Sequence, residues 1–285
     1  MSMNILIKDV SVTYQPRTPF HFNALKDITT EFCKGCFYGI IGHTGSGKST
    51  LVQLLNGLIL PTQGTVEIDN IKIHRKTKYK VIHEVRKHIG IVFQFPEHQL
   101  FEETVLKDVM FGPMNMGVSE TEAKKRAIYY LNELSVDESL FEKSPFDLSG
   151  GQMRKVALAG ILAMEPEVLI LDEPTAGLDP VSHRETMHLF KSLREKLDLT
   201  IILVTHDMND VFEFTDEVKI LEKGHIVENG KTDEILTNEA MLEKYSLNLP
   251  DVVRLSLDLR RKGYDIDRIP KSIDEFIVEW RLNHA

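Results

Sequence analysis

The stretch "GHTGSGKST" at residues 42–50 constrains the fold of this chain more than any other feature. It fits G-x-x-x-x-G-K-[ST], follows the apolar run "FYGII" and precedes the helical pattern "LVQLLNGL". Glycines let the backbone turn closely enough for its N–H groups to face phosphate oxygens, and the following helix directs its positive end at the same anion. A strand, a phosphate-binding loop and a helix in this order predict nucleotide binding in an α/β domain.

Individual residues of this loop have predicted contacts. We expect Lys48 to reach the β- and γ-phosphates and the Ser49 hydroxyl to ligate Mg²⁺. The nucleotide contacts expected from the loop come from Gly42, Thr44, Gly45, Ser46, Gly47, Lys48, Ser49 and Thr50.

Two adjacent acids end the apolar run "VLILD" at residues 168–172. Asp172 is suited to hold Mg²⁺ through water, and Glu173 follows it directly. Consecutive acids at the end of a buried strand are costly unless they face a cation or a polarised water. A solvated strand end before a proline turn is the alternative, and the phosphate-binding loop in the same chain argues against it.

The motif "LSGGQ" at residues 148–152 predicts a second anion site. Ser149 is a good N-cap for the helix that follows, and the two glycines expose backbone N–H groups at its positive end. This half-site has no lysine of its own, while residues 42–50 already provide a full cradle for one nucleotide. We therefore interpret it as closing over a nucleotide held by another chain.

Composition excludes several classes of function. The net charge of −9 over 285 residues argues against a general nucleic-acid binder, which needs a basic face. No apolar run approaches the roughly 18–20 residues needed to span a bilayer. The first twelve residues read as an amphipathic strand and not as a signal peptide. We therefore expect a soluble, cytoplasmic protein with a sizeable core.

Two apparent metal motifs are rejected. Cys33 and Cys36 are spaced C-x-x-C, but no second such pair exists, so two thiols flanking a turn is the better interpretation. His83 and His88 are five residues apart, which turns them roughly 140° from each other on a helix.

The remaining patterns outline the domain. Alternating residues predict strands at 3–14 and at 65–73, the latter with a turn at Asp69. Continuous apolar runs at 168–172 and 200–207 predict strands buried on both faces of a parallel sheet. Ligands of such sheets bind beyond the carboxyl ends of the strands. A helix is predicted at 119–134, with a capping box and an apolar stripe of Ala127, Tyr130, Leu131 and Leu134.

The last part of the chain has a different pattern. A helix is predicted over 251–262, where Gly263 follows a basic last turn. A second helix over 273–283 begins with a capping box formed by Ser272 and Glu275. We expect a helical pair with an apolar face to bury, formed in the second helix by Ile273, Phe276, Ile277 and Trp280.

The order and spacing of these motifs resemble those of the ATP-binding-cassette (ABC) ATPases over about residues 3–230. The resemblance implies an α/β fold of the ABC-type P-loop NTPase class. Its RecA-like core would carry an antiparallel β subdomain, a helical subdomain at about 97–160 and a C-terminal helical extension over 231–285. The matching positions are residues 42–50, Gln94, 148–152, 169–173, Asp179 and His206.

The family implies a sandwich dimer in which each ATP lies between the loop of one chain and the "LSGGQ" motif of the other. Tyr14 occupies the place of the adenine-stacking aromatic, although Phe20 and Phe22 are nearby and a strand tyrosine can be core. By this resemblance the catalytic residues are Lys48, Gln94, Glu173 and His206, and the metal contacts are Ser49, Gln94 and Asp172. The nucleotide of the other chain would be contacted by Ser149, Gly150, Gly151 and Gln152. Asp179 would lie at the dimer seam.

Two further stretches, "FPEHQLF" (95–101) and "TYQPRTPFHFNAL" (13–25), resemble ATPases of energy-coupling-factor (ECF) importers for vitamins and their cobalt and nickel relatives. The resemblance implies a peripheral protein on the cytoplasmic face of the membrane. Its partners would be a second ATPase, an integral coupling subunit and a substrate-binding membrane subunit. Phe95 and Leu100 would then grip a helix of the membrane partner, and Glu97 would supply a charge to it. The extension would help hold the ATPase pair together.

Other functions remain open at this point. The chain could serve another ABC importer or an exporter, or act as a non-transport ABC clamp, although no heptad insertion of the kind found in DNA-acting clamps is present. A silent regulatory partner is disfavoured because Glu173 and His206 are both in place. The basic stretch 72–88 reads as a solvated face, with lipid or nucleic-acid contact as alternatives. A full set of half-sites makes a homodimer chemically possible.

Overall fold

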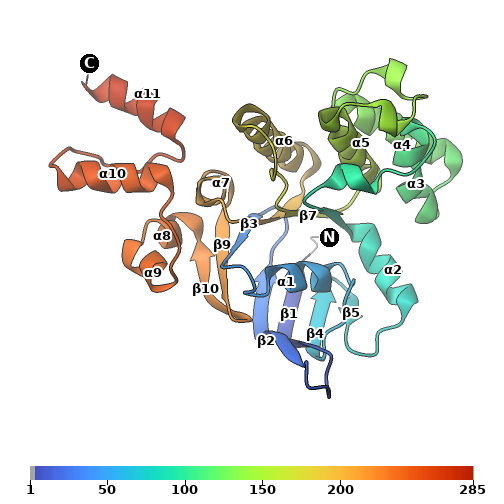
Figure 1. Cartoon of the computed structure of the whole chain (residues 1–285), viewed down its shortest axis with the longest axis horizontal. Coiled ribbons are helices and arrows are strands. Elements are labelled where there is room, and N and C mark those ends of the chain that lie inside the picture. The colour runs from blue at the N-terminus through green and yellow to red at the C-terminus, as the bar shows by residue number, and fades with distance from the viewer. Residues whose placement is uncertain (1–3, 285) are drawn as a thin grey trace.

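A computed structural model describes residues 4–284, and its strands form two sheets (Figure 1). One has the order β10-β9-β3-β8-β7-β6, and the other has the order β2-β1-β4-β5. The strands are β1 Ile5–Tyr14, β2 Phe22–Phe32, β3 Phe37–Ile41, β4 Gln63–Ile68, β5 Ile71–Ile73, β6 Ile89–Val92, β7 Val168–Asp172, β8 Thr200–Val204, β9 Glu217–Glu222 and β10 His225–Lys231.

Helices cover the larger sheet and form both ends of the molecule. The α-helices are α1 Lys48–Leu55, α2 Tyr79–His88, α3 Val105–Asn115, α4 Glu120–Glu133, α5 Gly150–Leu162, α6 Pro180–Leu197, α7 Met208–Phe214, α8 Thr232–Leu236, α9 Glu239–Lys244, α10 Asp251–Arg261 and α11 Ile273–His284. Short 3-10 helices lie at η1 Pro96–Gln99, η2 Glu138–Leu140 and η3 Pro145–Asp147.

The larger sheet is parallel except for its edge strand β10, which runs antiparallel to β9. The predicted buried runs form β7 and β8; β8 pairs with β3, and β7 pairs with β8 on its other side. Strand β8 ends at Val204, three residues before the end of the predicted run. Asp207 leaves the sheet because its carboxylate caps α7, accepting from the Asn209 N–H at 2.8 Å.

Helix α1 lies between the two sheets. Its residues Leu51 and Leu55 are buried in one apolar cluster with side chains of β1, β2 and β4 on one side and of β3, β7 and β8 on the other. This burial explains why a loop so rich in glycine is followed by so apolar a helix. The glycine-rich loop before α1 is thereby held at the junction of the sheets.

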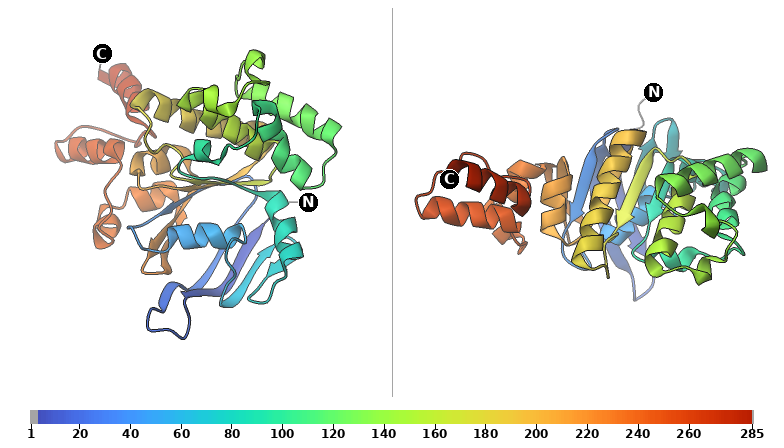
Figure 2. Two further views of the ribbon diagram at one scale, coloured as in Figure 1. Left: turned by 45° about the vertical axis from the view of Figure 1, so that its right-hand side comes forward. Right: turned by 90° about the horizontal axis from the view of Figure 1, so that it is seen from above.

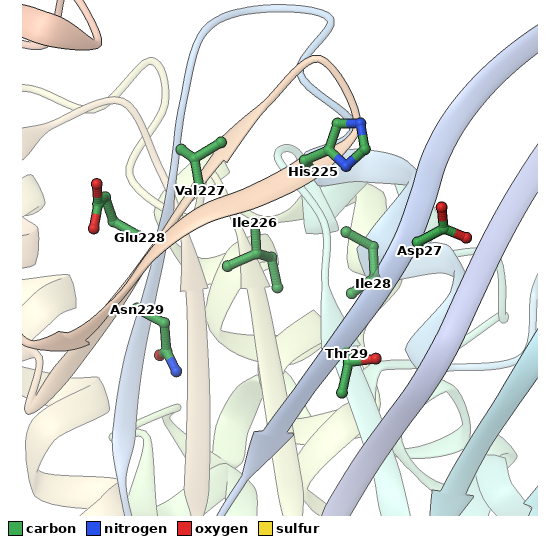
Figure 3. A pocket seen from close by; sticks show the side chains of 8 residues that line it. All are labelled: Asp27, Ile28, Thr29, His225, Ile226, Val227, Glu228 and Asn229. Carbon is green, nitrogen blue, oxygen red and sulfur yellow. The ribbon is translucent and has the colours of Figure 1, made fainter.

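The smaller sheet is antiparallel. The pattern predicted over 65–73 is a hairpin of β4 and β5, and Asp69 adopts the left-handed conformation at its turn (φ 48°). The predicted strand at 3–14 is β1, although residue 3 lies outside the described residues. A hollow of about 350 Å³ lies where β2 meets β10, lined by residues 27–29 and 225–229 (Figure 3). It contains none of the predicted site residues.

The helices α3, α4 and α5 pack together at one end of the molecule, opposite the C-terminal helices (Figures 1 and 2). Helix α4 is the predicted amphipathic helix. The Ser119 hydroxyl caps it by accepting from the Glu122 N–H, and the predicted stripe is buried. Among the described residues, no helix combines the length and the apolar character that crossing a membrane requires.

The C-terminal helices α10 and α11 form the predicted pair, with Gly263 in the left-handed conformation after the first. The apolar stripe of α11 is divided between two surroundings. Phe276 is buried and its ring stacks on Trp280 with 5.7 Å between centroids, whereas Ile273 and Ile277 are 38% and 41% exposed. Part of the predicted face is therefore covered by this chain, and part faces outward.

Candidate nucleotide-binding and catalytic site

The glycine-rich loop between β3 and α1 is built in a shape that side chains would prevent. Gly42 and Gly47 have φ values of 145° and 113°, in the region that favours glycine. A Cβ atom at Gly42 would lie 2.1 Å from the Leu221 carbonyl oxygen, and one at Gly47 would lie 2.7 Å from that of Ala24. The chain can therefore follow this path only with glycine at both positions.

The loop is also fixed from outside. The Gly224 N–H, in the turn between β9 and β10, donates to the Ser46 carbonyl at 2.9 Å. The Gly224 carbonyl accepts from the Lys26 N–H of β2 at 2.8 Å. One residue thus ties the phosphate-binding loop to strands of both sheets. The Ser46 hydroxyl is buried and has no hydrogen-bond partner among the described residues.

Lys48 is the first residue of α1, and its side chain folds back over the loop. Its Nζ donates to the carbonyl oxygens of Gly42 at 2.6 Å and His43 at 3.1 Å. Burial lowers the pKa of the Lys48 ammonium, and the carboxylates of Glu173 and Asp172 oppose that shift. The ammonium therefore lies among the loop atoms that would surround a phosphate.

The acidic pair at the end of β7 is held in a partly buried position. Burial, followed by repulsion from Glu173, raises the pKa of Asp172, whereas the charge of Lys48 acts in the opposite direction. Glu173 adopts the left-handed conformation with φ 50°, and its N–H donates to the Val204 carbonyl at 2.8 Å. Such a conformation costs about 1–3 kcal/mol and often occurs at functional sites.

The Glu173 carboxylate contacts the end of the neighbouring strand β8. One of its oxygens, Oε1, lies 2.9 Å from Nδ1 of His206, and the Thr205 hydroxyl donates to the other at 3.3 Å. The hydrogen bond and the charge of Glu173 together raise the pKa of His206. Sequence reasoning missed Thr205, although a hydroxyl residue directly before His206 at a strand end was a usable signal.

The "LSGGQ" residues form a complete cap at the start of α5. The Ser149 hydroxyl accepts from the Gln152 N–H, and the Gln152 side chain accepts in return from the Ser149 N–H at 3.0 Å. Gly150 and Gly151 are exposed, and a Cβ atom on either would meet nothing within 4 Å. No hydrogen bond between described residues joins 148–152 to residues 42–50 of the same chain.

Two other predicted residues lie at ends of secondary structure. Asp179 caps α6 by accepting from the Val181 and Ser182 N–H groups, and the Ser182 hydroxyl holds its pKa below the usual value. Tyr14 ends β1 and is 38% exposed. Its hydroxyl lies 3.3 Å from the Thr50 hydroxyl oxygen of α1, so the ring is next to the loop helix. Phe22 faces Tyr14 across the two strands.

The residues proposed to hold Mg²⁺ offer a suitable set of donors. Ser49, Asp172 and Gln94 supply a hydroxyl, a carboxylate and an amide oxygen, and hard oxygen ligands of this kind are those that Mg²⁺ prefers. Among the described residues, no hydrogen bond joins the side chains of Ser49 or Gln94 to Asp172. Gln94 is exposed, and its backbone carbonyl accepts from Arg154 at 3.4 Å.

The structure corrects two predictions in the stretch 95–101. Leu100 does not face outward, because it is only 6% exposed and belongs to the main apolar cluster. Glu97 is not free for a partner's charge, because its carboxylate forms an ion pair with Arg154 at 3.2 Å. The exposed apolar side chains of this stretch are Phe95 and Phe101, at 42% and 56%.

Comparisons with known proteins agree with this fold and site. The sequence pattern of the ABC transporter family matches residues 25–176. Over 275 residues the chain is 49% identical to the energy-coupling factor transporter ATP-binding protein EcfA2 of Streptococcus thermophilus, covering 96% of this chain and 98% of the relative. Over 273 residues it is 52% identical to EcfA2 of Streptococcus pyogenes, covering 96% and 97%.

Solved structures agree as well. CbiO1 of Clostridium perfringens, part of the ABC transporter complex CbiONQ, superposes with a TM-score of 0.73 at 38% identity, over 88% of this chain and 97% of that chain. The ATP-binding cassette MJ0796, in a dimeric post-hydrolysis state bound to ADP and phosphate, gives a TM-score of 0.70 at 33% identity over 80% and 98%.

The fold and the site define an ATP-binding cassette ATPase, and the chain belongs to the ABC transporter family. Within that family it belongs with the ATP-binding proteins of energy-coupling factor transporters. The predicted fold class, an ABC-type P-loop NTPase, is therefore confirmed.

Proposed function

We propose that this ATPase powers an ECF-type importer, in which it drives uptake of a vitamin or a metal ion through a membrane partner. The observation that carries the proposal is that Lys48 of the phosphate loop lies close enough to Glu173 and His206 for their charges to interact, at the carboxyl edge of the parallel sheet. This is the edge at which ligands of such sheets bind. Glu173 and His206 themselves form a pair with 2.9 Å between Oε1 and Nδ1.

Hydrolysis of ATP is mainly a problem of position and charge, because the γ-phosphoryl group spreads negative charge over its oxygens as water attacks in line. In this proposal the N–H groups of residues 42–50 and the Lys48 ammonium bind the phosphates. The carboxylate of Glu173 orients the attacking water and accepts its proton, and His206 donates a hydrogen bond to the γ-phosphate. Tyr14 stacks on the adenine.

Ser49, Asp172 and Gln94 would hold the Mg²⁺ bound with ATP, and the ion would supply further neutralisation of phosphate charge. The partial burial of Asp172 supports this role, since a half-buried carboxylate beside Glu173 gains most from a nearby cation.

Two copies of the cassette complete each site. In this proposal residues 149–152 contact the nucleotide of the second chain, with the N–H groups of Gly150 and Gly151 directed at it, and Asp179 lies at the seam. Support comes from the open face of Gly150 and Gly151 and from the positive end of α5 behind them. The second chain is either a paralog or another copy of this chain.

The domain boundaries follow from the same proposal. Residues 1–230 form the ATPase domain, with the helical subdomain at about 97–160, and residues 231–285 form the extension. Residues 1–3 and 285 lie outside the described residues. Helix α8 begins at Thr232, directly after the edge strand β10, which supports the second boundary.

The membrane partner docks on an exposed apolar surface of the helical region. Phe101 and Phe111 form an edge-to-face pair with 4.8 Å between ring centroids, and they are 56% and 42% exposed. Phe95 and Met114 are 42% and 45% exposed. Exposed apolar groups of this kind fit a helix from a membrane subunit, which would hold the ATPase at the cytoplasmic face of the membrane.

Purification from membranes tests this proposal. The native protein should co-purify with integral subunits and support ATP-dependent uptake. Phe101→Asp should lose both properties, because it places a charge in the aromatic pair, whereas basal ATPase should remain. Tyr129→Asp is the matched control, since Tyr129 is 52% exposed on α4 outside this surface. Co-purification of nucleic acid in place of membrane subunits would favour the clamp function and reject an importer.

The extension helps to hold the two ATPases together. Outside the contacts made within the chain, α11 exposes Ile277, Val278 and Leu282 at 41%, 58% and 78%. Burying a side chain of this size yields about 1.5–3 kcal/mol, so these three positions can contribute to a dimer interface.

Deleting residues 246–285 should weaken dimerisation in the absence of ATP more than it weakens ATP binding. Ile277→Asp should act in the same direction without disturbing the fold, and Tyr79→Asp, at a 72% exposed position on α2, is the control. Sedimentation with and without the paralog measures the effect. An unchanged sedimentation profile for both altered proteins would mean that the extension is not part of the dimer interface.

A further inference from the structure

Arg154 lies on α5, five residues after Ser149, and forms an ion pair that differs from the others between described residues. Its side chain is 14% exposed and that of its partner Glu97 is 17% exposed, whereas every other such pair has at least one side chain exposed by more than 20%. Charged groups are seldom buried to this degree without a specific reason, because removing them from water is costly.

The guanidinium of Arg154 joins three segments. Its Nε and Nη2 donate to the two carboxylate oxygens of Glu97 at 3.2 and 3.4 Å. Nη2 also donates to the backbone carbonyls of Gln94 and Ala176, each at 3.4 Å. Gln94 and Glu97 follow β6, and Ala176 lies in the loop between Glu173 and Asp179. The planar guanidinium has several N–H donors and can bind the Glu97 carboxylate and both backbone carbonyls at once. A lysine ammonium cannot reproduce that geometry.

The segments joined by Arg154 also touch one another directly. A Cβ atom at Gly177 would lie 3.6 Å from the Phe95 ring, so the loop after Glu173 contacts the stretch after Gln94. Next to this contact, a cavity of about 600 Å³ separates part of α5 from the 174–178 loop and α6, and Arg154 lies in its wall. The first turns of α5 are therefore separated from α6 by this cavity, while later residues of the helix, such as Leu162, join the main apolar cluster. The hydrogen bonds of Arg154 cross between the segments beside the cavity.

The relation of these segments to the two nucleotides of the dimer rests on the proposed function. The first residues of α5 would bind the nucleotide of the second chain, while Gln94 and Glu173 would act on the nucleotide of this chain. Arg154 lies on the same helix as Ser149, about 7.5 Å further along its axis. We infer that Arg154, together with Glu97, is a positioning residue that couples the two ATP sites of the dimer. Movement of α5 toward the second nucleotide pulls the Gln94 backbone and the 173–179 loop of its own site.

A double-mutant cycle in the assembled transporter tests this inference. The variants are Arg154→Met, Glu97→Gln, the two combined, and Arg154→Lys. The matched control is Lys155→Met, since Lys155 is the next residue on the helix and is exposed. Arg154→Met should lower kcat by about 2- to 30-fold, the range found for residues that carry coupling between sites, with the KM for ATP little changed. Arg154→Lys should not keep the native kcat, although it keeps the positive charge.

The combined variant separates positioning from stability. Arg154→Met alone leaves a buried carboxylate without its partner and should lower the melting temperature, whereas replacing both charges is often neutral. The combined variant should therefore unfold like the native protein and still turn over as slowly as Arg154→Met. If its kcat returns to the native value together with its melting temperature, the pair is merely structural and the inference is wrong.

Failure of this inference is distinguishable from failure of the proposed function. If Glu173→Gln is inactive while Arg154→Met matches Lys155→Met in kcat, the proposed catalytic site is supported and the coupling role of Arg154 is rejected. If Glu173→Gln keeps native turnover, the proposed function itself is wrong.

Discussion

Glu173→Gln should slow ATP hydrolysis by about 10²- to 10⁴-fold, the usual contribution of a positioned general base, while ATP still binds. The reason is that glutamine keeps the size of the side chain but cannot accept a proton from water. The Thr205 hydroxyl can still donate to the amide oxygen, as it does to the carboxylate at 3.3 Å, so the position of the side chain is retained. Because hydrolysis normally ends the closed state, ATP should also trap the variant as a closed dimer.

Turnover of radiolabelled ATP and sedimentation in ATP measure these two effects. Glu195→Gln is a matched control, because Glu195 is exposed on α6 and makes no ion pair with another described residue. Native turnover by the Glu173→Gln protein would exclude Glu173 as the base.

A spectroscopic readout accompanies the same substitution. Since the hydrogen bond and the charge of Glu173 raise the pKa of His206, glutamine should bring that pKa back toward its ordinary value. In the native protein the pair stabilises the fold fully below about pH 6.5, and this contribution is lost as the pH rises through the raised pKa. NMR titration of the imidazole should show the lower pKa in the variant.

Ser149→Arg should abolish hydrolysis and leave the ATP affinity of the isolated chain unchanged. Serine caps α5 through its hydroxyl, and an arginine removes the cap and adds a positive charge at the positive end of the helix. The long side chain would also occupy the open space beside Gly150 and Gly151, where the nucleotide of the second chain is expected. The damage should therefore appear only in the dimer.

Mixed dimers of native and Ser149→Arg chains give the sharpest measurement, because the loss should fall on the ATP held by the native chain. Ser139→Arg is the control, since Ser139 is exposed in the same helical region. A fall in the ATP affinity of the isolated variant chain would mean that Ser149 serves its own nucleotide, and the two-chain site would be rejected.

Local patterns were sufficient to predict the architecture of the core. The loop at 42–50, the apolar run of β7 and the cap at Ser149 each depend on neighbouring residues, so they could be recognised from the sequence alone. The hairpin turn at Asp69 is of the same kind. Which of the predicted residues serve one nucleotide was implied by the resemblance to the ABC ATPases and stays a prediction.

Contacts between distant residues could not be predicted in this way. Glu97 and Arg154 are 57 positions apart, and nothing near either residue indicates that they meet. The burial of Leu100 depends on how the helical region packs, which periodicity does not specify. The stripe on α11 is a similar case, because the sequence shows an apolar face but not that Phe276 turns inward while Ile277 turns outward.

The hydrogen bonds of Gly224 give the antiparallel sheet a part in nucleotide affinity. Because Gly224 binds the Ser46 carbonyl and is itself bound by the Lys26 N–H, hydrogen bonds to both sheets hold the loop in shape without a nucleotide. Folding has already removed the conformational entropy that a mobile loop would lose on binding, and such preorganisation strengthens binding without adding a contact to the ligand. If the loop binds ATP as proposed, the strand β2 is in this sense a determinant of how tightly ATP is held.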